Sequence, residues 1–284
     1  MPLRMQPLIP IEQFQVFSTG LDHPECVALD SRGTLWAGGE AGQVYRIDAE
    51  GKAETVCTLG SFNAGLAFSP DDVLHVCNPA RGVVQVWPDG STKDFASHAV
   101  DHKIVCANFA VFDRAGNLYL TDSGQWKKQN GFLLRIDPSG KGEVIGGPLG
   151  YANGLALSSD QRTLFMVESN TDRILRFSIS AHGALSEADV FAENVGRLPD
   201  GLALDAGQNV YAACYASDEI WRISPTGEKQ LLAWDHHAIL LSRPTNIAFG
   251  GEDFEEIFVA NLGRQTITRA KIDRVGQRLS NLSK

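Results

Sequence analysis

Residues 198–224, LPDGLALDAGQNVYAACYASDEIWRIS, predict three short β-strands joined by tight turns. Small and large apolar residues alternate from Gly201 to Leu204, and residues 205–209 then supply Asp, Gly and Asn for a turn. Two more β-rich runs follow, at 210–214 and 219–223. One acidic residue, Asp200, stands at the start of the first strand.

The same pattern occurs six times along the 284 residues. The first strand and its turn are HPECVALDSRG, FNAGLAFSPDD, CANFAVFDRAG, YANGLALSSDQ, LPDGLALDAGQ and RPTNIAFGGED. The position equivalent to Asp200, called here the aligned position, is occupied in turn by Glu25, Ala64, Asn108, Asn153, Asp200 and Thr245. These positions are 39 to 47 residues apart, which is the length of one propeller blade. The sequence therefore predicts an all-β fold, a six-bladed β-propeller with four-stranded blades.

We expect a single domain over residues 1–284, with blades that begin near residues 25, 64, 108, 153, 200 and 245. A strand at about 12–17 is left over before the first blade, and little sequence follows the third strand of the last blade at 266–272. The N-terminal strand is predicted to complete the last blade, which closes the ring and hides an exposed edge.

Charge and cysteine content limit the partners and the compartment. The net charge is −9 and no basic patch is visible, so neither nucleic acid nor an anionic membrane is an expected partner. Five scattered cysteines without a CxxC pair indicate reduced thiols rather than a disulfide framework. The N-terminus lacks a signal-peptide pattern, and no segment has the apolar length to cross a bilayer. We expect a cytoplasmic protein that acts on a small molecule.

Polar residues converge where the repeat places them on one axis. The first strand of each blade lines the central channel of a propeller, and four of the six aligned positions carry an oxygen-bearing side chain: Glu25, Asn108, Asn153 and Asp200. Two carboxylates and two amide oxygens suit a hard divalent cation, with Ca²⁺ preferred and Mg²⁺, Mn²⁺, Zn²⁺ or Fe²⁺ as alternatives. The other interpretation is that these residues hydrogen-bond neighbouring strands or hold channel water. Their shared register favours one metal ion.

On these residues the chain resembles the senescence-marker-protein/gluconolactonase family of regucalcin-like six-bladed propellers, over residues 11–272. Glu25, Asn153 in NGLA and Asp200 in PDG match the family pattern, and Asn108 matches a further Asn that contacts metal or substrate. The resemblance implies a metal-dependent hydrolase, most often a lactonase, with Asp200 as catalytic base or nucleophile. Sugar-lactonase members have Arg and Asp where this chain has Cys106 and Phe109, which indicates a less polar or differently decorated lactone.

The expected hydrolysis gives roles to the other candidate residues of the site. A cation would polarise the ester carbonyl while Asp200 accepts a proton from the attacking water. The longest loop at the pocket end, SGQWKKQN at 123–130, is predicted to bring Trp126 over the site, although Trp126 could equally cover the rim. Tyr215 is expected near the mouth, and Arg243 is expected to bind a substrate carboxylate or pair with an acidic surface residue.

Other functions fit the same residues. Phosphotriester hydrolysis at the same metal and a non-catalytic metal- or metabolite-binding propeller are the main alternatives. A protein scaffold has no need for polar residues at one register, and a strictosidine-synthase-like enzyme has no need for metal ligands. The chain lacks a GxSxG elbow, an HExxH motif, a Walker A loop and a GxGxxG turn, which argues against serine-hydrolase and nucleotide-dependent chemistry.

Overall fold

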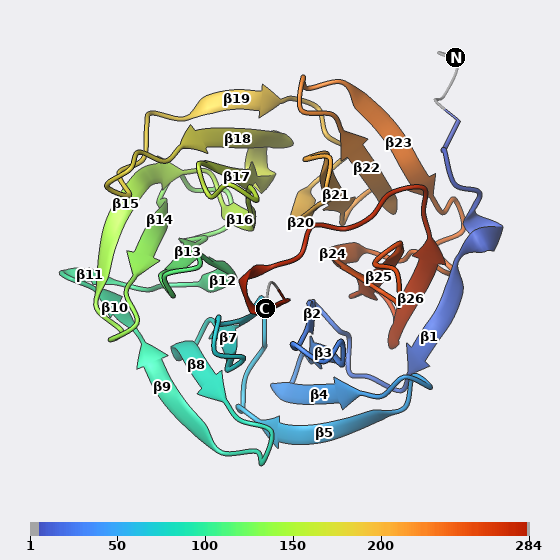
Figure 1. The fold of residues 1–284 in the computed structure, drawn as a ribbon, viewed down its shortest axis with the longest axis horizontal. Helices are drawn as coiled ribbons and strands as arrows, with labels where there is room; N and C mark the ends of the chain where they lie inside the picture. The colour runs from blue at the N-terminus through green and yellow to red at the C-terminus, as the bar shows by residue number, and fades with distance from the viewer. Residues whose placement is uncertain (1–5, 283–284) are drawn as a thin grey trace.

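The computed structural model describes residues 6–282, and its strands form six four-stranded antiparallel sheets around a central axis (Figure 1). The predicted six-bladed β-propeller is therefore confirmed. The outermost residues of the predicted domain, 1–5 and 283–284, lie outside the described part of the chain. Within each of the first five blades the strands follow one another from the axis to the rim, as expected for a meander with short connections.

The blades have these bounds. Blade 1 is β2 (Val27–Leu29), β3 (Leu35–Gly38), β4 (Gln43–Ile47) and β5 (Ala53–Thr58), and blade 2 is β6 (Leu66–Phe68), β7 (Leu74–Asn78), β8 (Gly82–Val86) and β9 (Thr92–Ala96). Blade 3 is β12 (Ala107–Phe112), β13 (Leu118–Asp122), β14 (Gly131–Ile136) and β15 (Gly142–Leu149). Blade 4 is β16 (Ala152–Leu157), β17 (Thr163–Glu168), β18 (Arg173–Ser178) and β19 (Asp189–Ala192). Blade 5 is β20 (Pro199–Leu204), β21 (Val210–Cys214), β22 (Glu219–Ile223) and β23 (Lys229–Trp234). Blade 6 is β24 (Pro244–Gly250), β25 (Glu256–Asn261), β26 (Thr266–Lys271) and β1 (Gln15–Thr19).

Three short 3₁₀ turns and one hairpin complete the described elements: η1 (Ile11–Gln13), η2 (Ser169–Thr171), η3 (Ser280–Leu282), and β10 (His98–Ala99) paired with β11 (His102–Lys103). The inner strands are buried along most of their length, whereas outer strands such as β5 carry exposed positions. Inner strands need apolar side chains on both faces because a neighbouring blade covers each face. Edge-to-face ring pairs such as Trp36 with Phe68, at 5.8 Å, join adjacent blades.

The N-terminal strand closes the ring, as predicted. β1 pairs antiparallel with β26, Gln15 opposite Arg269, and Phe17 packs edge-to-face on Phe258 at 5.0 Å. The strand lies slightly later than the expected 12–17, because residues 11–13 form a 3₁₀ turn after Pro10. Proline fixes φ near its helical value, and Pro10 has a φ of −58°.

The C-terminal segment crosses the centre of the ring on one face (Figure 1). Gln277 donates to the carbonyl of Leu157 at 2.9 Å, and Asn281 donates to the carbonyl of Leu29 at 3.0 Å. Residues 277–282 thereby cover an apolar cavity of about 90 Å³, which is otherwise lined by the later residues of the inner strands. This end of the central channel is closed by the chain itself.

Candidate functional site

The other end of the channel holds a cavity of about 330 Å³ at the starts of the inner strands. All four predicted metal ligands line it, as do Cys106, Trp126 and Tyr215. The full lining is Glu25, Phe62, Ala64, Pro79, Cys106, Asn108, Trp126, Tyr151, Asn153, Ser169, Leu198, Asp200, Tyr215 and Leu262. The register of the repeat therefore brings its polar residues to one place.

β-Bulges displace the aligned residues in four blades, and in three of these blades the aligned side chain lines the cavity. In the fourth, the hydroxyl of Thr245 donates to the carbonyl of Glu25 at 2.6 Å. The register between the two inner strands shifts across Asn108, Asn153, Asp200 and Thr245, so that each of these residues lies in a bulge. A bulge breaks the alternation of a strand and changes the direction of a side chain. In blades 1 and 2 the inner strand begins only after the aligned residue, so Glu25 and Ala64 lie in the preceding loop.

A glycine after the aligned residue allows adjacent inner strands to approach closely. A Cβ on Gly154 would lie 2.1 Å from the carbonyl oxygen of Asp200 in the next blade. A Cβ on Gly65 would likewise lie 2.5 Å from the carbonyl oxygen of Asn108, and the Gly65 amide donates to that oxygen at 2.6 Å. Only glycine fits such contacts. The glycine of one blade thus sets the distance to the ligand-bearing strand of the next.

Two oxygens of the site are buried acceptors without a partner. Glu25 Oε2 and Asn153 Oδ1 have no hydrogen-bond donor in the described structure. The amide of Asn153 is oriented by its other end, since Nδ2 donates to Ser169 Oγ at 3.2 Å and Ser169 Oγ donates to the carbonyl of Pro199 at 2.7 Å. Unpartnered buried oxygens are costly, and a bound cation would satisfy both. The donor set present in the structure therefore fits a hard divalent metal ion.

Electrostatics support the same conclusion. Burial raises the pKa of Asp200 to about 8, opposed in part by the hydrogen bond from Asn153. Burial also raises the pKa of Glu25 well above its ordinary value, and the charges of Asp200 and Glu40 add to this effect. Without a cation, burial favours the protonated form of both carboxyls. A divalent charge would favour the ionised form of both.

Cys106 and Phe109, which replace the polar residues of sugar lactonases, lie in different places. Cys106 lines the cavity, and burial together with the charge of Asp122 raises the pKa of its thiol to about 11, so that it is neutral at pH 7. Phe109 lines the apolar cavity beneath, where it packs with Leu66 and Leu155. The bulge that turns Asn108 towards the upper cavity leaves the next side chain pointing along the channel, so the structure separates Phe109 from the predicted substrate pocket.

The walls of the cavity include a residue that sequence reasoning missed. Tyr151 lies two residues before the aligned Asn153 and contacts Trp126 edge-to-face, with ring centroids 4.8 Å apart. The equivalent residues of blades 2, 3 and 5 also line the cavity: Phe62, Cys106 and Leu198. Tyr151 and Leu198 have positive φ, 60° and 50°, an uncommon conformation for such side chains. Applying the repeat two positions upstream would have identified this group.

Arg243 supports the wall from outside the cavity lining. Its Nη1 donates to the hydroxyl of Tyr215 at 3.2 Å, and its guanidinium carbon lies 5.4 Å from the centroid of that ring. The backbone amide of Arg243 donates to Asp218 at 2.7 Å. The guanidinium is thus occupied in holding Tyr215, which itself faces the cavity.

His102 pairs with a buried carboxylate. Its Nε2 lies 2.8 Å from Asp122 Oδ2, and Asp122 also accepts the backbone amides of Val105 and Cys106 at 2.9 and 2.8 Å. Asp122 is fully buried at the end of β13. These bonds fix the loop that carries Cys106 into the site.

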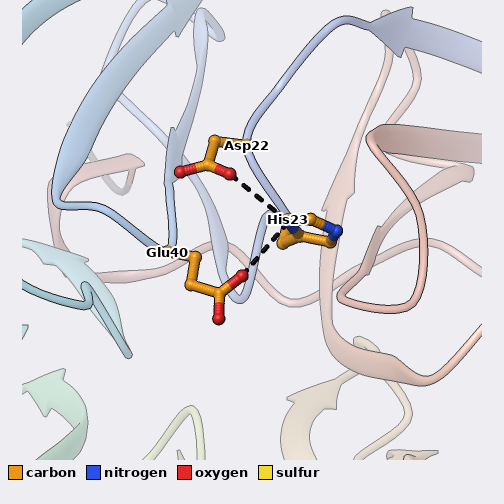
Figure 2. A group of neighbouring side chains, drawn as sticks. All are labelled: Asp22, His23 and Glu40. Atoms are coloured by element: carbon orange, nitrogen blue, oxygen red, sulfur yellow. Dashed lines mark hydrogen bonds and ion pairs between the residues drawn. The ribbon is translucent and has the colours of Figure 1, made fainter.

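A further group of ionisable side chains joins the loop before Glu25, which carries Asp22 and His23, to Glu40 in the connection between β3 and β4. Figure 2 shows His23 between Asp22 and Glu40, with Nδ1 3.3 Å from Asp22 Oδ1 and 3.1 Å from Glu40 Oε2. Their ligand-type atoms lie within 4.8 Å of one another, but all three side chains are partly exposed. Asp22 also accepts the amide of Ala41 at 2.9 Å. We interpret the group as an ion-pair cluster that fixes the loop leading to Glu25.

The chain resembles known proteins over most of its length. A family model described as SMP-30/Gluconolactonase/LRE-like region matches residues 23–262. The chain belongs to the SMP-30/gluconolactonase family. The resemblance inferred from Glu25, Asn153 and Asp200 is therefore confirmed.

Several known proteins match most of this chain. Pentonolactonase XacC of Haloferax volcanii is 24% identical over 237 residues, which cover 82% of this chain and 79% of the relative. Two solved structures, a gluconolactonase of Xanthomonas campestris and the calcium-binding protein regucalcin of Agrobacterium tumefaciens, both superpose with a TM-score of 0.79 at 18% identity. The alignments cover 91% of this chain and 89% of the first, and 97% of this chain and 98% of the second. At this identity the structural likeness establishes the fold. Among the described residues, none of the helices is long and apolar enough to span a membrane.

Proposed function

We propose that this protein is a metal-dependent lactonase that opens a cyclic ester in the cavity above Glu25, Asn108, Asn153 and Asp200. The observation that carries the proposal is the pair of unpartnered buried oxygens, Glu25 Oε2 and Asn153 Oδ1, beside the carboxyl of Asp200. The sequence predicts a hydrolase of ester bonds, and this is borne out by a family whose named relatives include a pentonolactonase and a gluconolactonase.

The four aligned side chains would hold one divalent cation, with calcium preferred because every donor is a carboxylate or amide oxygen. The same donors could also hold magnesium, manganese, zinc or ferrous iron, but oxygen ligands favour these ions less than calcium here. When bound, the cation supplies Lewis acidity towards the carbonyl oxygen of the lactone and a charge that keeps Glu25 and Asp200 ionised. The calcium-binding regucalcin structure supports this choice of metal.

Asp200 is the proposed general base. Among the described residues, no lysine, arginine or histidine lines the cavity, so no side-chain cation there competes for its carboxylate. The carboxylate accepts a proton from water as the water oxygen attacks the lactone carbonyl carbon. It returns that proton to the ring oxygen when the ester C–O bond breaks, which releases the hydroxy acid. Asn153, held by Ser169, donates to Asp200 and orients it.

The side chains that line the cavity above the metal ligands are assigned to contacts with the organic part of the substrate. Cys106, Trp126 and Tyr215 line this cavity, and Arg243 acts through Tyr215. Phe109 would act only through the packing of the channel. The five unpaired cysteines favour a reducing compartment such as the cytoplasm.

The decisive experiment measures hydrolysis of several lactones and one aryl phosphotriester, before and after chelation, with each of the five metals added back. We expect metal-restored lactone opening in the wild type and a loss of at least 100-fold in kcat in Asp200→Asn, as is typical when a general base is removed. Asp101→Asn, which changes an exposed carboxylate in the turn between β10 and β11, outside the cavity lining, is the matched control.

The other functions are outcomes of the same experiment. Turnover of the phosphotriester without lactone opening would replace the lactonase by a phosphotriesterase. Metal binding without any turnover would leave a metal- or metabolite-binding propeller. Full activity of Asp200→Asn would refute the role of Asp200 as base while leaving the reaction class intact.

A further inference from the structure

The cavity above the proposed metal ligands has an unusual division of polarity. Its carboxyl and amide groups are confined to the aligned residues, and most of the remaining lining comes from the connections between strands. Those connections contribute Phe62, Pro79, Trp126, Tyr151, Leu198, Tyr215 and Leu262. A substrate with its ester at the floor would therefore place its remaining atoms against aromatic and aliphatic groups.

These walls have little capacity to replace water around a polyhydroxylated substrate. Within the described lining, the only charged groups are the carboxyls of Glu25 and Asp200, both on the floor. The hydroxyl of Ser169 is committed to Pro199, and the wall residues of the described lining add the hydroxyls of Tyr151 and Tyr215, of which the Tyr215 oxygen already accepts from Arg243. A sugar with several hydroxyl groups would lose more hydrogen bonds to water than two tyrosine hydroxyls can replace, which weakens binding.

One wall is suited to an apolar group. Trp126 and Tyr151 meet at an interplanar angle of 90°, and together they form an aromatic corner. Trp126 is 45% exposed although it is large and apolar. Exposed aromatic surface at the mouth of a cavity marks a place where a ligand covers it.

We propose that the substrate is a lactone that carries an apolar alkyl or aryl substituent, which packs against Trp126, Tyr151 and Phe62. This inference rests on the proposed lactonase activity, and it names the class of lactone that this chain takes. Cys106 fits the same assignment, since its side chain is small and weakly polar and lies in the lining beside the aligned Asn108.

The experiment measures kcat/KM for γ-lactones whose side chain lengthens one methylene at a time, from γ-butyrolactone to γ-octalactone, and for D-glucono-1,5-lactone. Each methylene buried against the walls should raise kcat/KM about threefold to fourfold until the cavity is filled. The sugar lactone should be slower than γ-octalactone. Trp126→Ala should reduce the gain per methylene, whereas Val144→Ala, which removes an exposed side chain on β15, should keep the wild-type gradient.

A second measurement separates this inference from the proposed function. Alkyl-substituted γ-lactams of the same chain lengths are not readily hydrolysed, and their affinity can be measured by calorimetry in the presence of calcium. Lactone opening with a flat or falling gradient, or with preference for the sugar lactone, would overturn the inference and retain the lactonase. If no lactone is opened, the lactonase fails, and the lactams decide: affinity that rises with chain length supports the apolar pocket, and constant affinity overturns it.

Discussion

Replacing Asp200 by Asn should stabilise the metal-free protein and abolish most of its stabilisation by metal. The pKa of Asp200 in the folded chain, about 8, lies above its ordinary value of 3.8. Between these values the folded chain binds more protons than the unfolded chain, so stability falls as the pH rises. Asparagine has the same shape and can still accept the hydrogen bond from Asn153, but it carries no charge.

The size of the effect follows from the pKa. Three pH units between the ordinary value and pH 7, at about 1.4 kcal/mol each, correspond to roughly 4 kcal/mol. For a chain of this length that amounts to a shift in Tm of roughly 10 °C. Calcium at 100 times its Kd would return about 2.7 kcal/mol to the wild type. The variant has lost one of the two carboxylates, so calcium should return much less to it.

Thermal unfolding is the assay, carried out from pH 5 to pH 8 in a chelator and again with calcium. In the chelator the wild type should lose stability with rising pH while Asp200→Asn changes less, and calcium should narrow the gap in stability between the two proteins. The exposed variant Asp101→Asn should follow the wild type throughout. A variant that is no more stable than wild type in the chelator at pH 8, or that gains as much from calcium, would refute the electrostatic reasoning.

Three further predictions concern the stability of the ring that carries the site. Gly154→Ala should cost about 1–3 kcal/mol of unfolding free energy and lower lactone turnover, because the new Cβ meets the carbonyl of Asp200. Gly146→Ala is the control: its new Cβ would have its nearest neighbour 3.5 Å away, so both quantities should stay unchanged. Equal behaviour of the two variants would contradict the argument that Gly154 allows a close approach of the strands. Burial lowers the pKa of His75 to about 4 from an ordinary 6.5, so stability should fall by up to about 3 kcal/mol as the pH drops through that window, and His75→Gln should flatten this dependence in denaturant titrations. Asn281→Ala should lower the free energy of unfolding by about 1 kcal/mol through loss of its bond to β2, and an unchanged free energy of unfolding would show that this bond of the C-terminal segment does not stabilise the ring.

The blades could be predicted from sequence because strand, turn and strand recur with a constant period, and a period survives small errors at each boundary. The convergence of Glu25, Asn108, Asn153 and Asp200 followed from the same period, since one register of a propeller has one position relative to its axis. The different direction of Phe109 could not be predicted in this way. It depends on a bulge, which is a shift in backbone pairing that side-chain patterns do not specify.

The closure of the channel by the C-terminal segment could not be predicted from the sequence either. Residues 273–282 have no strand or helix period, and the bonds that hold them reach backbone carbonyls far away in the chain, at Leu157 and Leu29. Contacts between irregular backbone and distant carbonyls leave no local signal. Tyr151 is a different case, because the repeat contained its signal two positions upstream of Asn153.

The pairing of β1 with β26 has a consequence for the order in which the molecule forms. Joining Gln15 to Arg269 closes a loop of more than 250 residues, for which the chain-length part of the entropy cost is roughly 5 kcal/mol. Five blades can assemble from local hairpins as they leave the ribosome, but the sixth must wait for both ends of the chain. The last blade therefore holds the ring closed, and we expect the native protein to open first at this blade.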